Sequence, residues 1–331
     1  MFKKILFFSA FLSLLVIPLT SQSQVLYKLN GKNIEVKDLS ASQQQQYFEF
    51  QFENYEKNRM LLDQSLFDQH VVEEAKKTKK TPEQVSAGLL KTDEVSDKEA
   101  KTWFDKNRTK IPPQYTLDQV KGELKKFIET EKREVKKNEI LKKIKSDQKF
   151  ELALVKPQAP EVKISVDDYF SKGSKSAKVT LVEFADYQCP HCKATAPEVK
   201  KLADKYKDKL RVVYIDFAFN PSGISKVIAQ GAYCAGQKDK DKYWDYNRIA
   251  FEKQPNVDKD TPLVIAKELK INAEEFKTCV DSKAAIDYVN RGKVEGEKVG
   301  VNGTPAIFIN GRRYLGSHQF EDLKKVVDEQ M

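Results

Sequence analysis

The residues best suited to chemistry are two of the four cysteines, Cys189 and Cys192, which form a Cys-X-X-Cys pair. The apolar run over 179–184 predicts a buried strand, and the pattern that includes Leu202 and Tyr206 predicts a helix that begins at the pair. The free N–H groups and the macrodipole of a helix N-terminus stabilise a thiolate. We therefore expect Cys189 to be a nucleophile and Cys192, one turn later on the same face, to be the resolving thiol.

A zinc site is the alternative use of such a pair, but it needs two further ligands, usually from a second pair. The other cysteines, Cys234 and Cys279, lie 45 residues apart, and the chain has only three histidines. Two of these, His70 and His318, have no partner at a ligand spacing, so we expect structural or surface roles for them. The sequence favours a redox-active pair that needs neither a metal nor an organic cofactor.

Several motifs accompany the cysteine pair at defined spacings: Cys189-Pro190-His191-Cys192 itself, Glu183 six residues before the pair, Pro197 eight residues after its first cysteine, and Gly303-Thr304-Pro305 ahead of an apolar run over 306–309. With these motifs, residues 161–331 resemble the thioredoxin superfamily, and its DsbA-like branch in particular. The resemblance implies an α/β thioredoxin-like fold with a helical insertion, and disulfide exchange with protein clients.

The same resemblance implies roles for four residues around the cysteines. Pro305 would be cis and face the disulfide, Thr304 in the same loop would align a client strand, and His191 would tune the pKa of the nucleophilic thiol. Glu183 would be a buried acid that relays protons to the resolving cysteine. From the residues alone, Glu183 could instead face solvent, because side chains alternate along a strand and its two neighbours are apolar.

Further elements complete the predicted domain. We expect a strand over 210–217, mainly helical structure over 222–290, and a final helix from Phe320. The helical stretch resembles the insertion that separates DsbA-like proteins from plain thioredoxins, and both Cys234 and Cys279 lie in it. In an oxidising compartment their even number favours a structural disulfide, with two buried thiols as the alternative.

The N-terminus has the pattern of a secretory signal. Lys3 and Lys4 precede an apolar stretch over 5–17, and small residues at positions 21 and 23 favour cleavage after Ser23. A helix of that length rises about 20 Å, which is less than the roughly 30 Å of a bilayer core. We therefore expect residues 1–23 to be a signal peptide and the mature protein to be periplasmic or otherwise exported, where thiols can be held oxidised.

The composition bounds the number of domains and the kinds of partner. A length of 331 residues makes two domains the natural expectation. The formal charge of +9 is spread along the chain, without a basic block interleaved with aromatic residues, so nucleic acid is not an expected partner.

The N-terminal half is predicted to be mainly helical. A short hairpin, or a strand and turn, over 25–36 precedes helices over 39–57 and 58–80. Thr81 before Pro82 is a helix cap, and capping boxes at Ser96 and Thr116 open two further helices, the second running from 117 to 146. A strand is expected over 150–155. The resulting division is a helical domain over 24–155, a linker over 156–163 and the redox domain over 164–331.

This order resembles the N-terminal helical region of the SurA-type chaperones and prolyl isomerases, on the opening strand with Asn30-Gly31, the helix start at Ser96 and the long helix from Leu117. The resemblance implies chaperone-like binding of unfolded chains. A spacer or a dimerisation arm, which would allow a homodimer, is the alternative.

The leading hypothesis is an exported thiol-disulfide oxidoreductase that acts as a protein disulfide oxidase. Its expected partners are unfolded or cysteine-containing exported proteins and a membrane redox partner that resets the pair. A stabilised thiolate makes a disulfide more oxidising, which favours an oxidant or an isomerase over a reductase. The alternatives are a disulfide isomerase and a periplasmic holdase with secondary redox activity.

Overall fold

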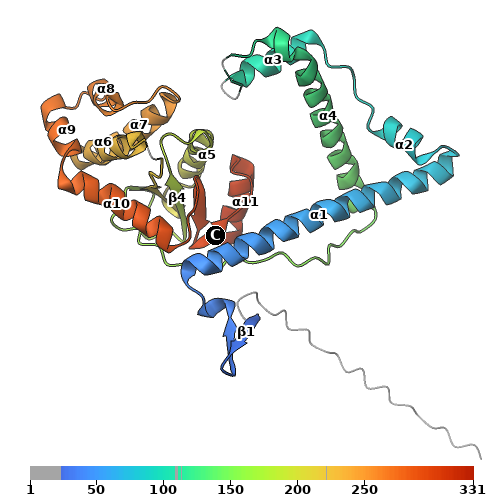
Figure 1. The fold of residues 1–331 in the computed structure, drawn as a ribbon, viewed down its shortest axis with the longest axis horizontal. Helices are drawn as coiled ribbons and strands as arrows, with labels where there is room; N and C mark the ends of the chain where they lie inside the picture. Colours follow the sequence, from blue (N-terminus) through green and yellow to red (C-terminus); the bar gives the residue numbers. More distant parts are fainter. Residues whose placement is uncertain (1–23, 109–110, 113, 221) are drawn as a thin grey trace, which may run out of the picture. The chain divides into compact units, whose positions relative to one another are not determined.

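The computed structural model describes residues 24–331, apart from 109–110, 113 and 221 (Figure 1). The predicted signal peptide lies outside the described residues. Two compact units share the chain: one comprises the described residues up to Gln51 together with Pro157–Met331, and the other is Phe52–Lys156. We call them the redox unit and the helical unit. Residues 24–51, assigned to the helical domain in the predicted division, belong to the redox unit, and the predicted linker over 156–163 is divided between the units after Lys156.

The redox unit contains a five-stranded sheet in the order β3-β5-β4-β6-β7. The two central strands, β4 (Val179–Ala185) and β5 (Leu210–Asp216), are parallel and almost wholly buried, as expected for strands covered on both faces. The others pair antiparallel to their neighbours and are β3 (Ser171–Lys172), β6 (Ala306–Ile309) and β7 (Arg312–Tyr314).

Helices cover both faces of this sheet (Figure 1). Helices α5 (Pro190–Tyr206) and α11 (Phe320–Gln330) cover one face, where Leu181, Leu202 and Leu323 are fully buried together. The other face packs against a set of helices that includes the predicted insertion: α6 (Ile224–Lys238), α7 (Lys240–Glu252), α8 (Thr261–Glu268), α9 (Ala273–Val280) and α10 (Lys283–Lys298).

A disulfide joins two helices of the insertion. Cys234 on α6 and Cys279 on α9 are bonded with an S–S distance of 2.04 Å. The bond crosslinks positions 45 residues apart in the chain, so it restricts the unfolded chain over that loop.

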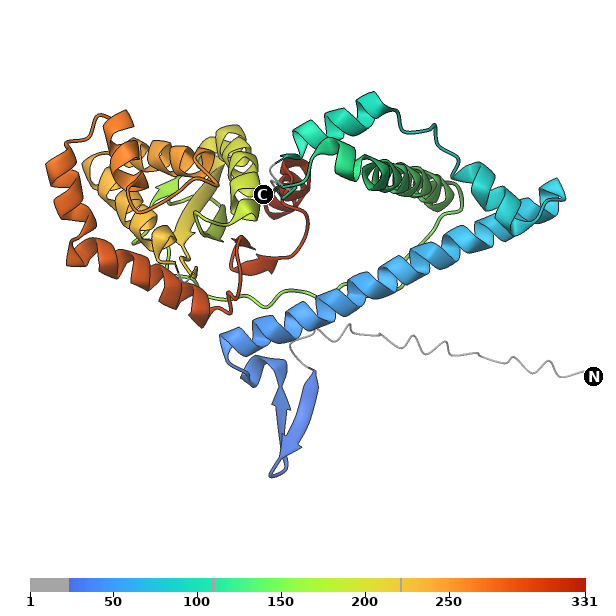
Figure 2. The same ribbon diagram turned by 45° about the horizontal axis from the view of Figure 1, so that its top comes forward.

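The N-terminal residues form a hairpin and the start of a long helix. Strands β1 (Val25–Leu29) and β2 (Lys32–Glu35) are joined by the predicted Asn30-Gly31 turn, whose two residues both have positive φ. After the short 3₁₀ helix η2 (Val36–Asp38), α1 (Ala41–Thr78) continues without interruption (Figure 2). The predicted break at 57/58 is therefore wrong, because no glycine or proline interrupts this stretch.

The helical unit consists of the rest of α1 with α2 (Pro82–Leu89), α3 (Asp97–Lys106) and α4 (Leu117–Asp147). The predicted capping residues Thr81, Ser96 and Thr116 all lie at helix N-caps. The strand predicted over 150–155 is wrong: these residues pair with no strand in the described structure. Without a neighbouring strand, the backbone N–H and C=O groups of an apolar run have no hydrogen-bond partners, so the run does not form a strand.

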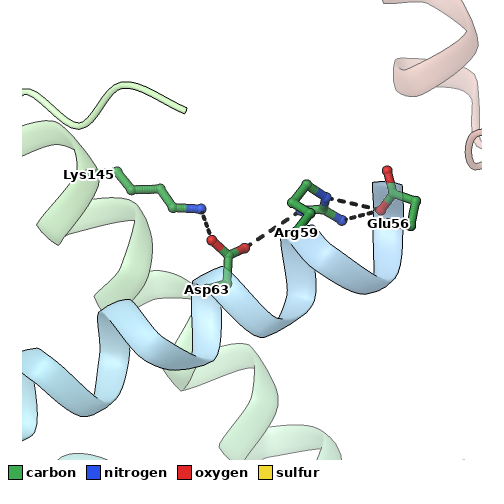
Figure 3. Close-up of polar contacts among 4 residues, drawn as sticks. All are labelled: Glu56, Arg59, Asp63 and Lys145. Carbon is green, nitrogen blue, oxygen red and sulfur yellow. Dashed lines mark hydrogen bonds and ion pairs between the residues drawn. The ribbon is translucent and has the colours of Figure 1, made fainter. Parts of the chain in front are cut away.

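Two small apolar clusters hold the helical unit together, one around Phe67 and Leu141 and one around Phe104 and Leu124. Polar contacts between α1 and α4 supplement the first cluster. In Figure 3, Asp63 on α1 forms an ion pair with Lys145 on α4, while Arg59 forms ion pairs with both Glu56 and Asp63. In the described part of the chain, no helix has both the length and the apolarity needed to span a membrane.

Candidate active site

The two unpaired cysteines lie where β4 passes into α5. Cys189 is the N-cap of α5, and the Cys192 backbone N–H donates to its Sγ over 3.4 Å. Cys189 is partly exposed, whereas Cys192 is fully buried. One thiol can therefore meet a partner in solution and the other cannot.

The surroundings of Cys189 favour its thiolate and lower its pKa to about 5. The hydrogen bond from the Cys192 side chain is the largest cause. Thr304 and the backbone N–H groups of Cys192 and His191 add further donors, while partial burial acts in the opposite direction. A thiolate at the N-terminus of a helix is a reactive nucleophile near neutral pH.

The surroundings of Cys192 have the opposite effect. Burial raises its pKa far above the usual thiol value, and the neighbouring Cys189 raises it further. Because Cys192 cannot ionise by itself near neutral pH, it needs a base to accept its proton when it attacks a disulfide.

Glu183 is suited to that role. It is only 2% exposed, so it does not face solvent, and its Oε1 has no hydrogen-bond partner among the described residues. Burial raises its pKa to about 8, and the charge of Cys189 adds to the effect. Glu183 in turn raises the pKa of Cys192, which places the two groups in electrostatic contact. The acid can exchange a proton near neutral pH.

Glu183 also lines a cavity of about 320 Å³ between α5 and α7. Val199, Phe251 and Lys193 also line this cavity.

The loop before β6 faces the cysteine pair. The Thr304–Pro305 peptide bond is cis, and the Cys189 thiol donates to the Thr304 carbonyl oxygen over 3.2 Å. The Thr304 hydroxyl has no partner in the described structure, so it is free to turn and donate to the sulfur once Cys189 is ionised. This loop and Cys189 together form the exposed face of the site.

Two histidines stand beside the pair, although only one was predicted there. His191, between the cysteines, is exposed. His318 is brought in from the segment after β7, where its Nδ1 lies 3.3 Å from the Thr195 hydroxyl. Burial lowers the pKa of His318, and the charges of Arg313 and His191 add to this effect. No local spacing marked His318, because its neighbours come from distant segments.

Asp186 is a further site residue that the sequence analysis missed. Its carbonyl oxygen accepts the Cys189 N–H over 3.0 Å, and its carboxylate accepts from the backbone N–H groups of Gln188 (2.7 Å) and Phe219 (3.2 Å). Ser225 at the start of α6 donates to the same carboxylate. An aspartate directly after a buried strand is the usual signal for such a turn.

The arrangement of side chains also shows whether a metal ion could be held. Within residues 24–331, leaving aside 109–110, 113 and 221, no group of three or more His, Cys, Asp or Glu side chains is placed to hold a metal ion.

Known proteins resemble the C-terminal half of the chain. Residues 166–329 match the family described as Thioredoxin. Disulfide bond formation protein D of Bacillus subtilis (strain 168) is 26% identical over 168 residues, which cover 48% of this chain and 75% of that protein. Its probable counterpart from Bacillus anthracis is 29% identical over 176 residues, covering 49% and 77%. The crystal structure of oxidised BdbD from Bacillus subtilis is 25% identical, with a TM-score of 0.48 over 52% of this chain and 98% of that one.

The fold, the cysteine pair and these relatives define the class. The C-terminal half of the chain is a thioredoxin-family domain, and its relatives are thiol-disulfide oxidoreductases of the DsbA-like type. The chemistry that the site supports is disulfide exchange. The family match begins at residue 166, so the SurA-like character of residues 24–155 stays a prediction.

Proposed function

We propose that this protein is an exported oxidoreductase that passes its Cys189–Cys192 disulfide to cysteine-containing client proteins. The observation that carries the proposal is the difference between the two cysteines. Cys189 is an accessible thiolate at a helix N-terminus, whereas Cys192 is a buried thiol with the acid Glu183 near it. An oxidase needs this asymmetry, because each half of the exchange uses a different sulfur.

The reaction balances with the residues of the site. A client thiolate attacks the Cys189 sulfur, the Cys189–Cys192 bond breaks, and Cys192 leaves with the electron pair and takes a proton from Glu183. A second client thiolate then attacks the client sulfur of the mixed disulfide and releases the Cys189 thiolate. The client loses two electrons and gains a disulfide, and the pair is left reduced.

The direction of transfer follows from the stability of the reduced form. A thiolate with a pKa near 5 stabilises the reduced pair relative to an ordinary dithiol, which makes the disulfide a stronger oxidant. A membrane redox partner, of the kind that serves DsbA-like oxidases, would then reoxidise the pair after each turnover.

We assign client holding to the helical unit. Met60 and Leu61 on α1 are 66% and 67% exposed, which is unusual for two adjacent large apolar side chains. A pocket of about 650 Å³ on the same unit is lined by Val71, Pro82 and Leu90, among others. Exposed apolar side chains and an open pocket on one unit suit an extended, unfolded chain.

Trapping of mixed disulfides tests the exchange assignment. The Cys192→Ser protein should accumulate covalent adducts with an unfolded client that carries a disulfide, because the Cys189 thiolate attacks that disulfide and the Cys192 sulfur that would resolve the adduct is gone. The matched control is the Cys189→Ser/Cys192→Ser double variant, which should form none. If Cys192→Ser yields no adducts either, the roles assigned to the two cysteines are wrong.

The exposed apolar residues of the helical unit also favour a second activity, the holding of unfolded chains without redox chemistry. The double cysteine variant should then suppress aggregation of a cysteine-free client as well as wild type does. A Leu61→Ser variant should be weaker in this assay. If neither wild type nor the double cysteine variant suppresses aggregation, the helical unit does not act as a holdase.

A further inference from the structure

The turn that follows α7 reaches into the active site. Its residue Gln254 is 8% exposed, which is rare for an amide side chain. Its Nε2 donates to the carbonyl oxygen of Tyr187, and more weakly to that of Cys189 over 3.4 Å. Its own main-chain carbonyl accepts from the Nζ of Lys193 over 2.7 Å. One residue of the insertion therefore contacts the chain on both sides of the cysteine pair.

The preceding helix holds the same turn at a second point. The Asn247 side chain on α7 donates to the Tyr187 hydroxyl over 3.1 Å, and the Phe251 ring lies 5.0 Å from the Tyr187 ring. Tyr187 is thus fixed at its hydroxyl, its ring and its carbonyl group by one helix and the turn after it. Only the carbonyl contact, made by Gln254, extends to Cys189.

The position of the Cys189 sulfur depends on this peptide. The donors that stabilise its thiolate come from Cys192, His191 and Thr304, and each requires Sγ to stay above the first turn of α5. The carbonyl group of Cys189 accepts the Lys193 N–H within α5 over 3.1 Å, and Gln254 adds a longer contact there to its contact with the Tyr187 carbonyl. Loss of the amide would remove the contact with Tyr187 and loosen the 187–189 turn, which would shift the sulfur relative to its donors.

We propose that Gln254 is a positioning residue of the exchange reaction, which holds the 187–189 turn so that the Cys189 sulfur remains in contact with its N–H and O–H donors. This inference rests on the proposed function, in which the Cys189 thiolate is the leaving group when the client disulfide forms and the attacking group in the reverse direction. It assigns a role to the helical insertion, which supplies none of the reacting atoms.

The test uses the full chain with Gln254→Met, which keeps the length of the side chain and removes its donor. The control is Glu268→Gln, which removes the ion pair to Lys253 in the same turn and touches nothing in the site. Thiolate absorbance of the reduced protein is followed against pH. Gln254→Met should raise the pKa of Cys189 by about one unit, because a sulfur displaced from its donors loses the equivalent of about one hydrogen bond to its thiolate.

Reduction of a disulfide-containing peptide by the reduced protein gives a second measurement, because the Cys189 thiolate is the attacking group in that direction. At pH 5, a pKa shift from about 5 to about 6 lowers the thiolate fraction, and with it the rate, about fivefold. At pH 8 the two proteins should differ much less. Glu268→Gln should match wild type at both pH values.

The result that would overturn the proposal is a Gln254→Met protein that is less stable but titrates like wild type, because Gln254 would then be structural only. If that variant does not fold, Gln254→Asn, whose shorter amide does not reach the two carbonyls, should show the same shift. A wild-type protein without exchange activity would refute the proposed function, whereas the titration would still report on Gln254.

Discussion

The two units of this chain differ in how much of their apolar surface is buried. In the redox unit, β4 and β5 are buried along nearly their whole length and carry the acids Glu183 and Asp216 inside the core. In the helical unit, the buried residues form two separate small clusters, and Met60 and Leu61 remain exposed. The comparison shows that acids with raised pKa values need a dry interior, and it supports the proposal that the helical unit, whose apolar surface is left uncovered, holds clients.

Truncation of a core leucine should give the largest effect on stability, and its effect on exchange should differ between the two units. Leu202→Ala, in the redox unit, should cost about 4 kcal/mol and lower the temperature at which exchange is lost. Leu141→Ala, in the helical unit, should cost about 3 kcal/mol and leave exchange with a short peptide unchanged. Calorimetry and peptide exchange check both variants. Equal loss of exchange in the two proteins would show that the units are not independent.

The buried acid gives the next largest effect. Glu183 has an ordinary pKa near 4.5 when unfolded and about 8 when folded. Between these values the unfolded chain ionises while the folded chain keeps the proton, so stability falls as pH rises through this window. At pH 7, Glu183→Gln should stabilise the protein by up to about 3 kcal/mol and slow the formation of the mixed disulfide, the step in which Cys192 takes its proton.

A second buried acid provides the control. Asp216 lies at the end of β5, and burial, with the nearby Asp186, raises its pKa to about 8. Asp216→Asn should stabilise the protein in a similar way without slowing exchange. If Glu183→Gln is stabilised but exchanges at the wild-type rate over the same pH range, proton transfer through Glu183 is excluded.

The ionisation of Cys189 should set the pH profile of its reactivity. Alkylation of the reduced protein should be nearly constant above pH 6, reach half its maximum near pH 5, and fall about tenfold per pH unit below that. The folded pKa is lower than in an unfolded chain, so the reduced form also loses stability as pH falls through 5. Reactivity that rises only above pH 8 would show that no thiolate is stabilised.

The smallest effect is expected in the polar contacts of the helical unit. Lys145→Met removes the cation that joins α4 to Asp63 on α1 (Figure 3). Because both side chains are partly exposed and Asp63 keeps Arg59 nearby, the loss should be under about 1 kcal/mol. Urea unfolding against wild type measures it. A loss as large as that of Leu141→Ala would mean that ion pairs, and not apolar packing, hold this unit together.

Much of the redox unit could be predicted because its signals are local. The strand at Val179, the cysteine pair and the loop at Pro305 are each defined by a few adjacent residues, and the sheet brings them together. His318, Asp186 and Gln254 could not be placed in this way. Their partners lie on other segments, so only the packed fold shows what they contact.

The helical unit shows a different limit of prediction. Its helix starts followed from capping residues such as Thr81 and Ser96, because a cap involves only the next three residues. The predicted break in α1 and the predicted strand over 150–155 failed. A break needs a residue that disrupts the backbone, and a strand needs a partner, and the chain supplies neither at these positions.

The most direct test of the proposed direction of electron transfer is the reduction potential of the Cys189–Cys192 pair. It is obtained by equilibrating the full mature chain with glutathione buffers and counting alkylated thiols. A stabilised Cys189 thiolate predicts a value near or above about −180 mV, as for oxidases and isomerases. A value near about −270 mV, as for a reductase, would contradict the proposed direction of electron transfer.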